Sequence, residues 1–146
     1  MIVLDTNVLV AGLHSSQGCS RRILQATLEQ NLKVGASPAL FLEYEAVLTR
    51  KENLAACCLN RTEMIELLDA LAGILIPVDL NFLWRPQLRD PADEMVLETA
   101  VNGQAETLVT WNTRNFLPAV NKFELRVMRP DDFWTAFHAG LERSKR

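Results

Sequence analysis

The chain alternates short apolar runs with longer segments in which apolar residues recur every three or four positions. The short runs predict strands at 2–4, 33–36, 75–78, 107–110 and 125–128. The longer segments predict helices at 20–31, 37–50, 60–73, 90–103 and 130–141. Because strands and helices alternate, the pattern predicts an α/β fold whose parallel sheet is covered by helices on both faces.

Two segments show neither the short apolar run of a strand nor the repeat of an amphipathic helix. Residues 11–20 are small and polar and include Gly12 and Gly18, so they predict a loop with one helical turn before it. Residues 81–89 carry Trp84 and Pro86 and predict an irregular connection.

Length and composition place limits on the function. The 146 residues fit one domain, and we expect a single domain spanning 1–146 with a basic end from about residue 142. The net charge of −3 excludes a globally basic surface, so nucleic acid would have to contact a local patch. Most basic side chains are expected simply to face solvent. The candidates for phosphate contacts are Arg21, Arg22, Arg50, Lys51, Arg85, Arg89, Arg114, Lys122 and Arg126.

The remaining composition points to a cytoplasmic protein. No apolar run approaches the length of a membrane span, and the start lacks the basic region of a signal peptide. The three cysteines, Cys19, Cys57 and Cys58, have no zinc-site spacing and are expected to be reduced thiols.

Small polar side chains follow two of the predicted strands. Asp5, Thr6 and Asn7 come directly after the run at 2–4, and Thr110 ends the fourth strand. In open α/β sheets the carboxyl ends of the strands form the edge where ligands bind. A simple turn explains the first segment equally well, because Asp and Asn favour turns.

The acids on the predicted helices differ in the face that they occupy. Asp93 shares the face of Val96 and Leu97 and should point toward the sheet, whereas Glu94 and Glu98 should face solvent.

Two more acids, Glu43 and Glu45, flank the apolar stripe of the preceding predicted helix on opposite sides. They are about 160° apart at 100° per residue. Periodicity therefore does not decide which of the two belongs to a site.

Several acids at one sheet edge would repel one another. Two unit charges roughly 5 Å apart cost about 3 kcal/mol at an effective dielectric of 20. A bound cation relieves this repulsion, and oxygen ligands without His or Cys suit Mg²⁺ or Mn²⁺. A divalent ion held in this way suits phosphodiester hydrolysis.

Four segments together resemble the PIN-domain family: VLDTNVLV at the start, Ser37 to Glu43, the run from Arg89 to Asp93, and LVTWNTRNF. The resemblance extends to about residue 128 and is closest to toxin components of bacterial toxin–antitoxin pairs. It implies an α/β/α sandwich with a central parallel sheet of four to five strands. It also implies a Mg²⁺- or Mn²⁺-dependent ribonuclease acting on RNA, an antitoxin partner, and a homodimer or higher homo-oligomer.

The resemblance also implies roles for individual residues. It assigns the catalytic acids to Asp5, Glu43 rather than Glu45, and Asp93, with Asp5 and Asp93 holding the metal. Supporting positions are Thr6, Asn7, Asp90, Thr110, Asn112 and Asn115. Family members commonly carry an acid at one or both of the last two positions, where this chain has amides.

Two other functions stay open. The amides at Asn112 and Asn115 are compatible with a catalytically weakened PIN-like module that binds RNA or a partner. An aspartate-nucleophile phosphatase also begins with a strand that ends in Asp, but it usually needs a second acid two residues later, where this chain has Asn7.

Overall fold

The computed structural model describes residues 1–82 and 85–144. Trp84 of the irregular connection, and Lys145 and Arg146 of the expected basic end, lie outside the described residues.

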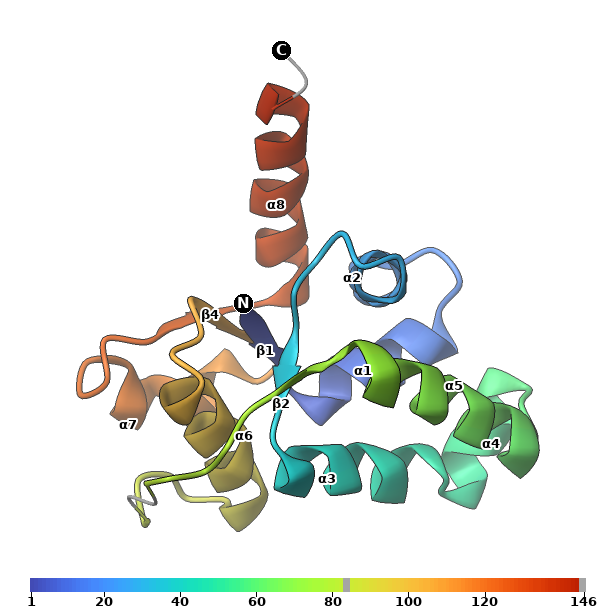
Figure 1. The fold of residues 1–146 in the computed structure, drawn as a ribbon, viewed down its shortest axis with the longest axis horizontal. Helices are drawn as coiled ribbons and strands as arrows, with labels where there is room; N and C mark the ends of the chain where they lie inside the picture. Colours follow the sequence, from blue (N-terminus) through green and yellow to red (C-terminus); the bar gives the residue numbers. More distant parts are fainter. Residues whose placement is uncertain (83–84, 145–146) are drawn as a thin grey trace.

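Parallel strands form the centre of the described structure (Figure 1). The strands are β1 (Ile2–Leu4), β2 (Gly35–Ala36), β3 (Ile76–Pro77), β4 (Thr107–Val109) and β5 (Arg126–Met128). β4 lies between β1 and β5 in one sheet, and β2 pairs with β3 in a second sheet. A bridge between Ile2 and Val34 joins the two sheets. The predicted parallel sheet is confirmed, although in the described part only three strands pair continuously and the bridge adds the other two.

Helices account for most of the remaining described chain. They are α1 (Thr6–His14), α2 (Cys19–Leu28), α3 (Pro38–Leu48), α4 (Lys51–Cys57), α5 (Arg61–Ile74), α6 (Pro91–Asn102), α7 (Leu117–Val120) and α8 (Pro130–Ser144), with a 3-10 helix, η1 (Thr113–Phe116). In the part of the chain that the structure describes, no helix combines the length and apolar character needed to cross a membrane.

The predicted loop after β1 is wrong in its first part. Residues 6–14 form the helix α1, which begins directly after Asp5. Thr6, Leu9 and Gly12, at helical spacing, are buried along one face. The β-branched residues in this segment lower helix propensity, but burial between neighbouring elements overrides that preference.

Two further helical segments were not predicted. α4 has no buried residue, so its sequence has no apolar stripe from which a helix could be predicted. α7 is four residues long, too short to show a period. The predicted helix at 60–73 is present as α5, and Asn60 caps it in a capping box with Glu63.

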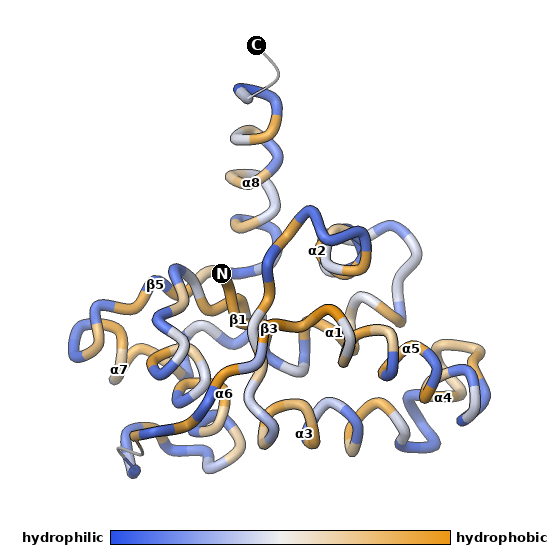
Figure 2. Tube along the Cα trace, viewed as in Figure 1, coloured by the Kyte–Doolittle hydropathy of each residue, from blue (hydrophilic) through white to orange (hydrophobic). Residues whose placement is uncertain are grey.

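The helices lie on two sides of the strands. In Figure 1, α3 and α6 lie below the strands, and α2 and α8 lie above them. α6 packs against β1, β2 and β4, while α2 packs against α1 and α8. The β1 side chains are buried on both faces, which explains the uninterrupted apolar run Ile2-Val3-Leu4. Figure 2 shows hydrophobic and polar residues alternating along α8 as it rises away from the rest of the chain.

A close approach between α1 and α2 depends on Gly12. A Cβ atom at this position would lie 2.9 Å from the carbonyl oxygen of Ser20 in α2. That separation is too short for a carbon atom, so only glycine allows the two helices to pack at this distance.

We therefore expect Gly12→Ala to lower the free energy of unfolding by about 1–3 kcal/mol, because the added methyl group must push α2 away. Gly140→Ala in α8 is the matched control, since a Cβ atom there meets no atom within 4 Å. The control should stabilise the chain by up to about 1 kcal/mol through helix propensity. Urea denaturation of both variants measures the two effects, and equal stabilities would contradict the packing argument.

Candidate active site at the carboxyl ends of β1 and β4

Asp5 lies at the carboxyl end of β1, beside the end of β4. The strand register pairs Leu4 with Val109, so the next residues, Asp5 and Thr110, are neighbours. The Thr110 hydroxyl donates a hydrogen bond of 2.7 Å to Oδ2 of Asp5. Both side chains are buried, so the hydroxyl fixes the orientation of a carboxylate that water scarcely reaches.

Asn7 in the first turn of α1 joins the same network. Its side-chain amide is 3.4 Å from the Thr110 hydroxyl, and its Oδ1 accepts a hydrogen bond of 3.3 Å from the backbone of Trp111. The Trp111 indole in turn donates to the Ser20 hydroxyl at 3.0 Å. Asn7 therefore ties α1 to the end of β4 and contacts the site through Thr110. Thr6 is buried next to Asp5.

Tyr44 holds α3 against the end of β1. Its buried hydroxyl donates a hydrogen bond to the carbonyl oxygen of Leu4, the residue before Asp5. Burial, and secondarily the charge of Asp5, raise the pKa of Tyr44 far above its usual value, so the phenol stays protonated as a donor.

The same helix resolves the choice between its two glutamates. Glu43, next to Tyr44, is half-buried and close enough to Asp5 for its charge to raise the pKa of Asp5. Glu45 is exposed. Of the two, Glu43 is the one that the structure brings to the site.

Asp93 reaches the site from the first turn of α6. Asp90 caps this helix by accepting a 2.9 Å hydrogen bond from the backbone of Ala92, and Pro91 occupies the first turn. Asp93 is 9% exposed, and its Oδ2 is a buried oxygen with no hydrogen-bond partner among the described residues. An unpartnered buried carboxylate oxygen is costly unless a proton or a cation compensates it.

Burial raises the pKa of both aspartates, and the charge of Asp5 adds to the shift of Asp93. Burial raises the pKa of Asp5 and outweighs the Thr110 hydrogen bond, which lowers it. Burial, then the charges of Asp5 and Asp90, raise the pKa of Asp93 to about 6. Asp5 and Asp93 therefore lie close enough for each to oppose the ionisation of the other.

The two asparagines after β4 occupy different positions. The Asn115 side chain lies within hydrogen-bonding reach of the Asp93 carboxylate and lowers its pKa. Asn112 is exposed, and its backbone amide donates a 3.0 Å hydrogen bond to the Thr110 hydroxyl. Of the two amides, Asn115 is therefore the one whose side chain meets an acid of the site.

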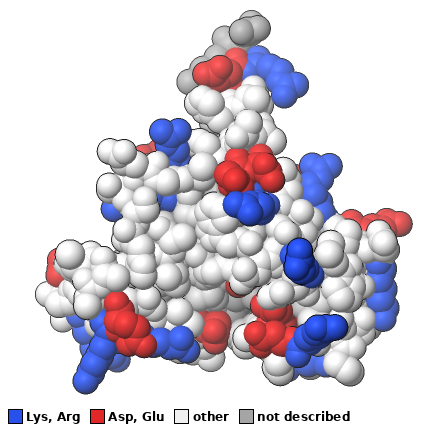
Figure 3. All heavy atoms as spheres, turned by 180° about the vertical axis from the view of Figure 1, so that it is seen from behind, with Lys and Arg blue, Asp and Glu red and all other residues white. Residues whose placement is uncertain are grey.

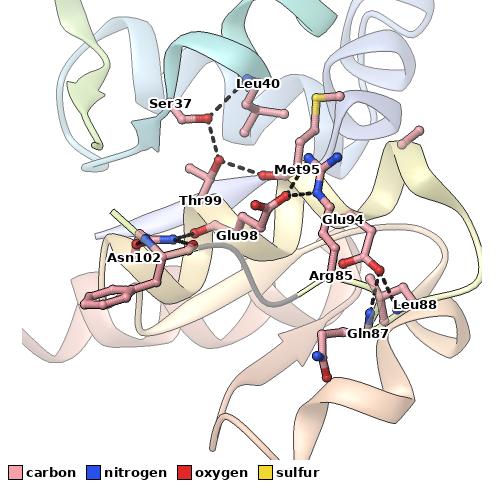
Figure 4. Close-up of polar contacts among 12 residues, drawn as sticks. Ser37, Leu40, Arg85, Gln87, Leu88, Glu94, Met95, Glu98, Thr99 and Asn102 are labelled. Atoms are coloured by element: carbon pink, nitrogen blue, oxygen red, sulfur yellow. Dashed lines mark hydrogen bonds and ion pairs between the residues drawn. The ribbon is translucent and has the colours of Figure 1, made fainter. Parts of the chain in front are cut away.

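The prediction that Glu94 and Glu98 face solvent is wrong. Both are buried, because residues 81–82 and 85–88 lie over that face of α6 (Figure 4). Glu98 Oε1 accepts a 2.6 Å hydrogen bond from the Arg85 guanidinium, and Glu94 Oε1 accepts hydrogen bonds of 2.6 and 2.7 Å from the backbones of Gln87 and Leu88. Periodicity indicates the face of a helix but not the chain that covers it.

Asn102 completes this row on α6, one turn after Glu98. Its Oδ1 accepts hydrogen bonds from the backbones of Asn81 and Phe82 at 3.1 and 3.0 Å. We call the described residues of this segment, 81–82 and 85–88, the strap. Two features of the sequence could have indicated the strap. The segment before Asp90 has no periodicity, and α6 carries three polar residues at intervals of four, Glu94, Glu98 and Asn102.

The acids fit a divalent ion held by few protein ligands. Among residues 1–82 and 85–144, no three Asp, Glu, His or Cys side chains come together closely enough to enclose an ion. Asp5 and Asp93 instead form a pair, and Asp93 Oδ2 is free to coordinate. Mg²⁺ is typically bound by one or two carboxylates, with water and substrate phosphate completing the shell.

The raised pKa of Asp93 predicts a pH dependence of stability without metal. The folded chain holds this proton more tightly than the unfolded chain, so the stabilisation is complete below about pH 4 and is lost as pH rises through 6. In EDTA, the melting temperature of Asp93→Asn should therefore increasingly exceed that of the parent from pH 4 to pH 7. We expect a final difference of about 3–5 °C. Thermal denaturation at several pH values tests this, and a constant difference would contradict it.

Comparisons with known proteins agree with this architecture. Residues 1–114 match the PIN domain family, whereas no curated relative matches the sequence. FitAB bound to IR36 DNA shares 22% identity, with coverage of 92% of this chain and 96% of that chain, and a TM-score of 0.61. VapBC2 from Rickettsia felis, bound to a DNA fragment from its promoter, shares 18% identity over 88% and 98%, with a TM-score of 0.60. FitAcB from Neisseria gonorrhoeae shares 23% identity over 89% and 98%, with a TM-score of 0.55.

At these identities the structural likeness shows a common fold. The family match covers most of the chain and includes the segments that carry Asp5, Glu43 and Asp93. The chain therefore belongs to the PIN domain family.

Proposed function

We propose that this chain is a metal-dependent ribonuclease and the toxin of a toxin–antitoxin pair. The observation that carries the proposal is the pair of buried aspartates, Asp5 and Asp93, whose charges repel, together with the unpartnered Oδ2 of Asp93. A proton or a divalent ion can compensate this arrangement, and the ion is the one that also supports a reaction. The family match and the fold neighbours support this function over the phosphatase.

In this proposal Asp5 and Asp93 hold Mg²⁺ or Mn²⁺. When bound, such an ion lowers the pKa of water and stabilises charge on a phosphodiester. Thr110 keeps the Asp5 carboxylate in one orientation, so that the pair is prepared before the ion arrives.

Glu43 has a separate role in the proposed reaction. It is half-buried beside Asp5 and remains accessible to water. A carboxylate in this position could accept the proton of the attacking water as its oxygen bonds to phosphorus and the bond from phosphorus to one ribose oxygen breaks, the leaving oxygen taking a proton from solvent. The Asn115 side chain lies within hydrogen-bonding reach of Asp93, and Asp90 caps the first turn of α6.

The partners follow from the same family. The fold neighbours were solved as FitAB, FitAcB and VapBC2, two of them on DNA. We propose an antitoxin that binds this chain and covers its acidic site, self-association as a homodimer or higher oligomer, and a cytoplasmic location.

A catalytically weakened binding module is the alternative. It is favoured by the uncharged Asn115 beside Asp93 and by the absence of an enclosed three-acid cluster in the described residues. The two proposals differ in whether purified protein cleaves RNA with Mn²⁺.

The first test removes each proposed acid. Asp5→Asn and Asp93→Asn should abolish Mn²⁺-dependent cleavage of RNA, and Glu43→Gln should slow it about 100-fold through loss of the proton acceptor. Glu45→Gln is the matched control, because this exposed neighbour lies away from the site and should leave activity unchanged. Circular dichroism checks that each variant is folded. Parental activity in any of the three site variants would remove that residue from the proposal.

The second test restores a charge. Asn115→Asp should tighten Mn²⁺ binding about tenfold, because it adds a carboxylate next to Asp93. Without metal the same variant should melt at a lower temperature, since the added charge repels Asp93. Asn112→Asp is the control and should change neither quantity, because Asn115 and not Asn112 is the asparagine whose side chain lowers the pKa of Asp93. Titration calorimetry and thermal denaturation give the two readouts, and unchanged affinity in Asn115→Asp would contradict this placement.

A further inference from the structure

A hollow of about 390 Å³ adjoins the acids and has a different chemical character. Asp93 and Asn115 form the wall that it shares with the site, and Asp90 lies next to them. The rest of its lining consists of two cations and an apolar wall: Arg89, Arg114, Leu117 and Pro118. This combination matches one nucleotide, which needs cations for its phosphate and an apolar surface for its base.

The two arginines are exposed and unpaired. Across residues 1–82 and 85–144, neither Arg89 nor Arg114 forms an ion pair or a side-chain hydrogen bond. By contrast, Arg85 and Arg129 are both occupied by carboxylates. The guanidinium groups at the hollow are therefore available to an anion without breaking an existing contact.

The backbone of Arg89 is held in place although its side chain is free. Arg89 directly follows the strap, whose last residues Gln87 and Leu88 donate to the buried Glu94 carboxylate. The buried Leu88 side chain anchors the same point. Glu94 has no place in the proposed reaction, and its contacts instead keep Arg89 at the rim of the hollow.

Arg114 is held from the other side. It lies in η1, between Asn112 and Asn115, which are joined by a 3.0 Å backbone hydrogen bond. The fully buried Phe116 fixes the end of this short helix. The hollow therefore has an arginine on each of two separate segments, and the backbone of each segment is held in place.

An apolar surface completes the hollow. Leu117 is 60% exposed, and Pro118 beside it is also exposed. An exposed leucine next to charged residues gains little stability for the fold, but it offers a face on which a base can lie. Figure 3 shows the molecule from behind the view of Figure 1. In the lower part of that face, acidic side chains lie beside Lys and Arg side chains, and there is no continuous basic surface.

We infer that this hollow binds the nucleotide next to the scissile phosphate of single-stranded RNA. Arg89 and Arg114 contact its phosphate, and Leu117 and Pro118 contact its base. This inference rests on the proposed ribonuclease function and adds to it the residues that position the substrate. A single-stranded chain is required, because the base must leave its stack to reach the apolar wall.

The test measures binding separately from cleavage. Fluorescence anisotropy follows a fluorescein-labelled eight-nucleotide single-stranded RNA in EDTA, at salt concentrations from 50 to 200 mM. Gel analysis of the same samples checks that the RNA stays intact. Arg89→Ala and Arg114→Ala should each weaken binding about tenfold and reduce the slope of log affinity against log salt by about 0.7.

Three further variants separate charge from shape. Arg89→Lys should restore the salt slope, because the charge is kept. Leu117→Ser should weaken binding about threefold with an unchanged slope, because the lost contact is apolar. Arg61→Ala at the start of α5 is the matched control, an exposed arginine far from the hollow, and should bind RNA like the parent.

The outcomes are distinct from those of the proposed function. Parental affinity and slope in both arginine variants would overturn the nucleotide site, even if the protein cleaves RNA with Mn²⁺. Absence of RNA binding by the parent in EDTA would overturn it as well. Loss of cleavage in Asp5→Asn and Asp93→Asn is measured independently and decides the catalytic proposal alone.

Discussion

The repulsion between Asp5 and Asp93 is the constraint on which the rest of the site depends. Two carboxylates are buried at the edge of a sheet, and each raises the cost of ionising the other. A small domain is stable by only about 5–15 kcal/mol, so the repulsion between two such carboxylates is a sizeable fraction of its free energy of unfolding. The surrounding elements nevertheless hold both side chains in buried positions.

Each of these elements is fixed by a specific contact. The parallel register of β1 and β4 sets Thr110 beside Asp5, and the Tyr44 hydroxyl holds α3 to the last carbonyl group of β1. Proline and the Asp90 cap determine where α6 begins, and therefore where Asp93 points. The β1–β4 register, the Asp90 cap and the Tyr44 hydrogen bond together position the acids, so the geometry of the site depends on several elements and not on one loop.

The sequence predicted those features that depend on a single element. Asp93 could be placed on the core face because its neighbours Val96 and Leu97 lie on the same helix, and the parallel sheet followed from the order of runs. Glu94 and Glu98 could not be placed, because their surroundings come from the strap, which has no period of its own. α1 was predicted as a single helical turn for a related reason: its helical form depends on burial between neighbouring elements more than on its residues.

The contacts of the strap also affect how this region opens. Glu94 lies in the first turn of α6, where a helix ordinarily frays. Here its carboxylate accepts hydrogen bonds from the backbone amides of Gln87 and Leu88, so unwinding of that turn would release these two residues of the strap at the same time. The end of the helix and the segment before it therefore form one cooperative unit, and their amide hydrogens should exchange with solvent together.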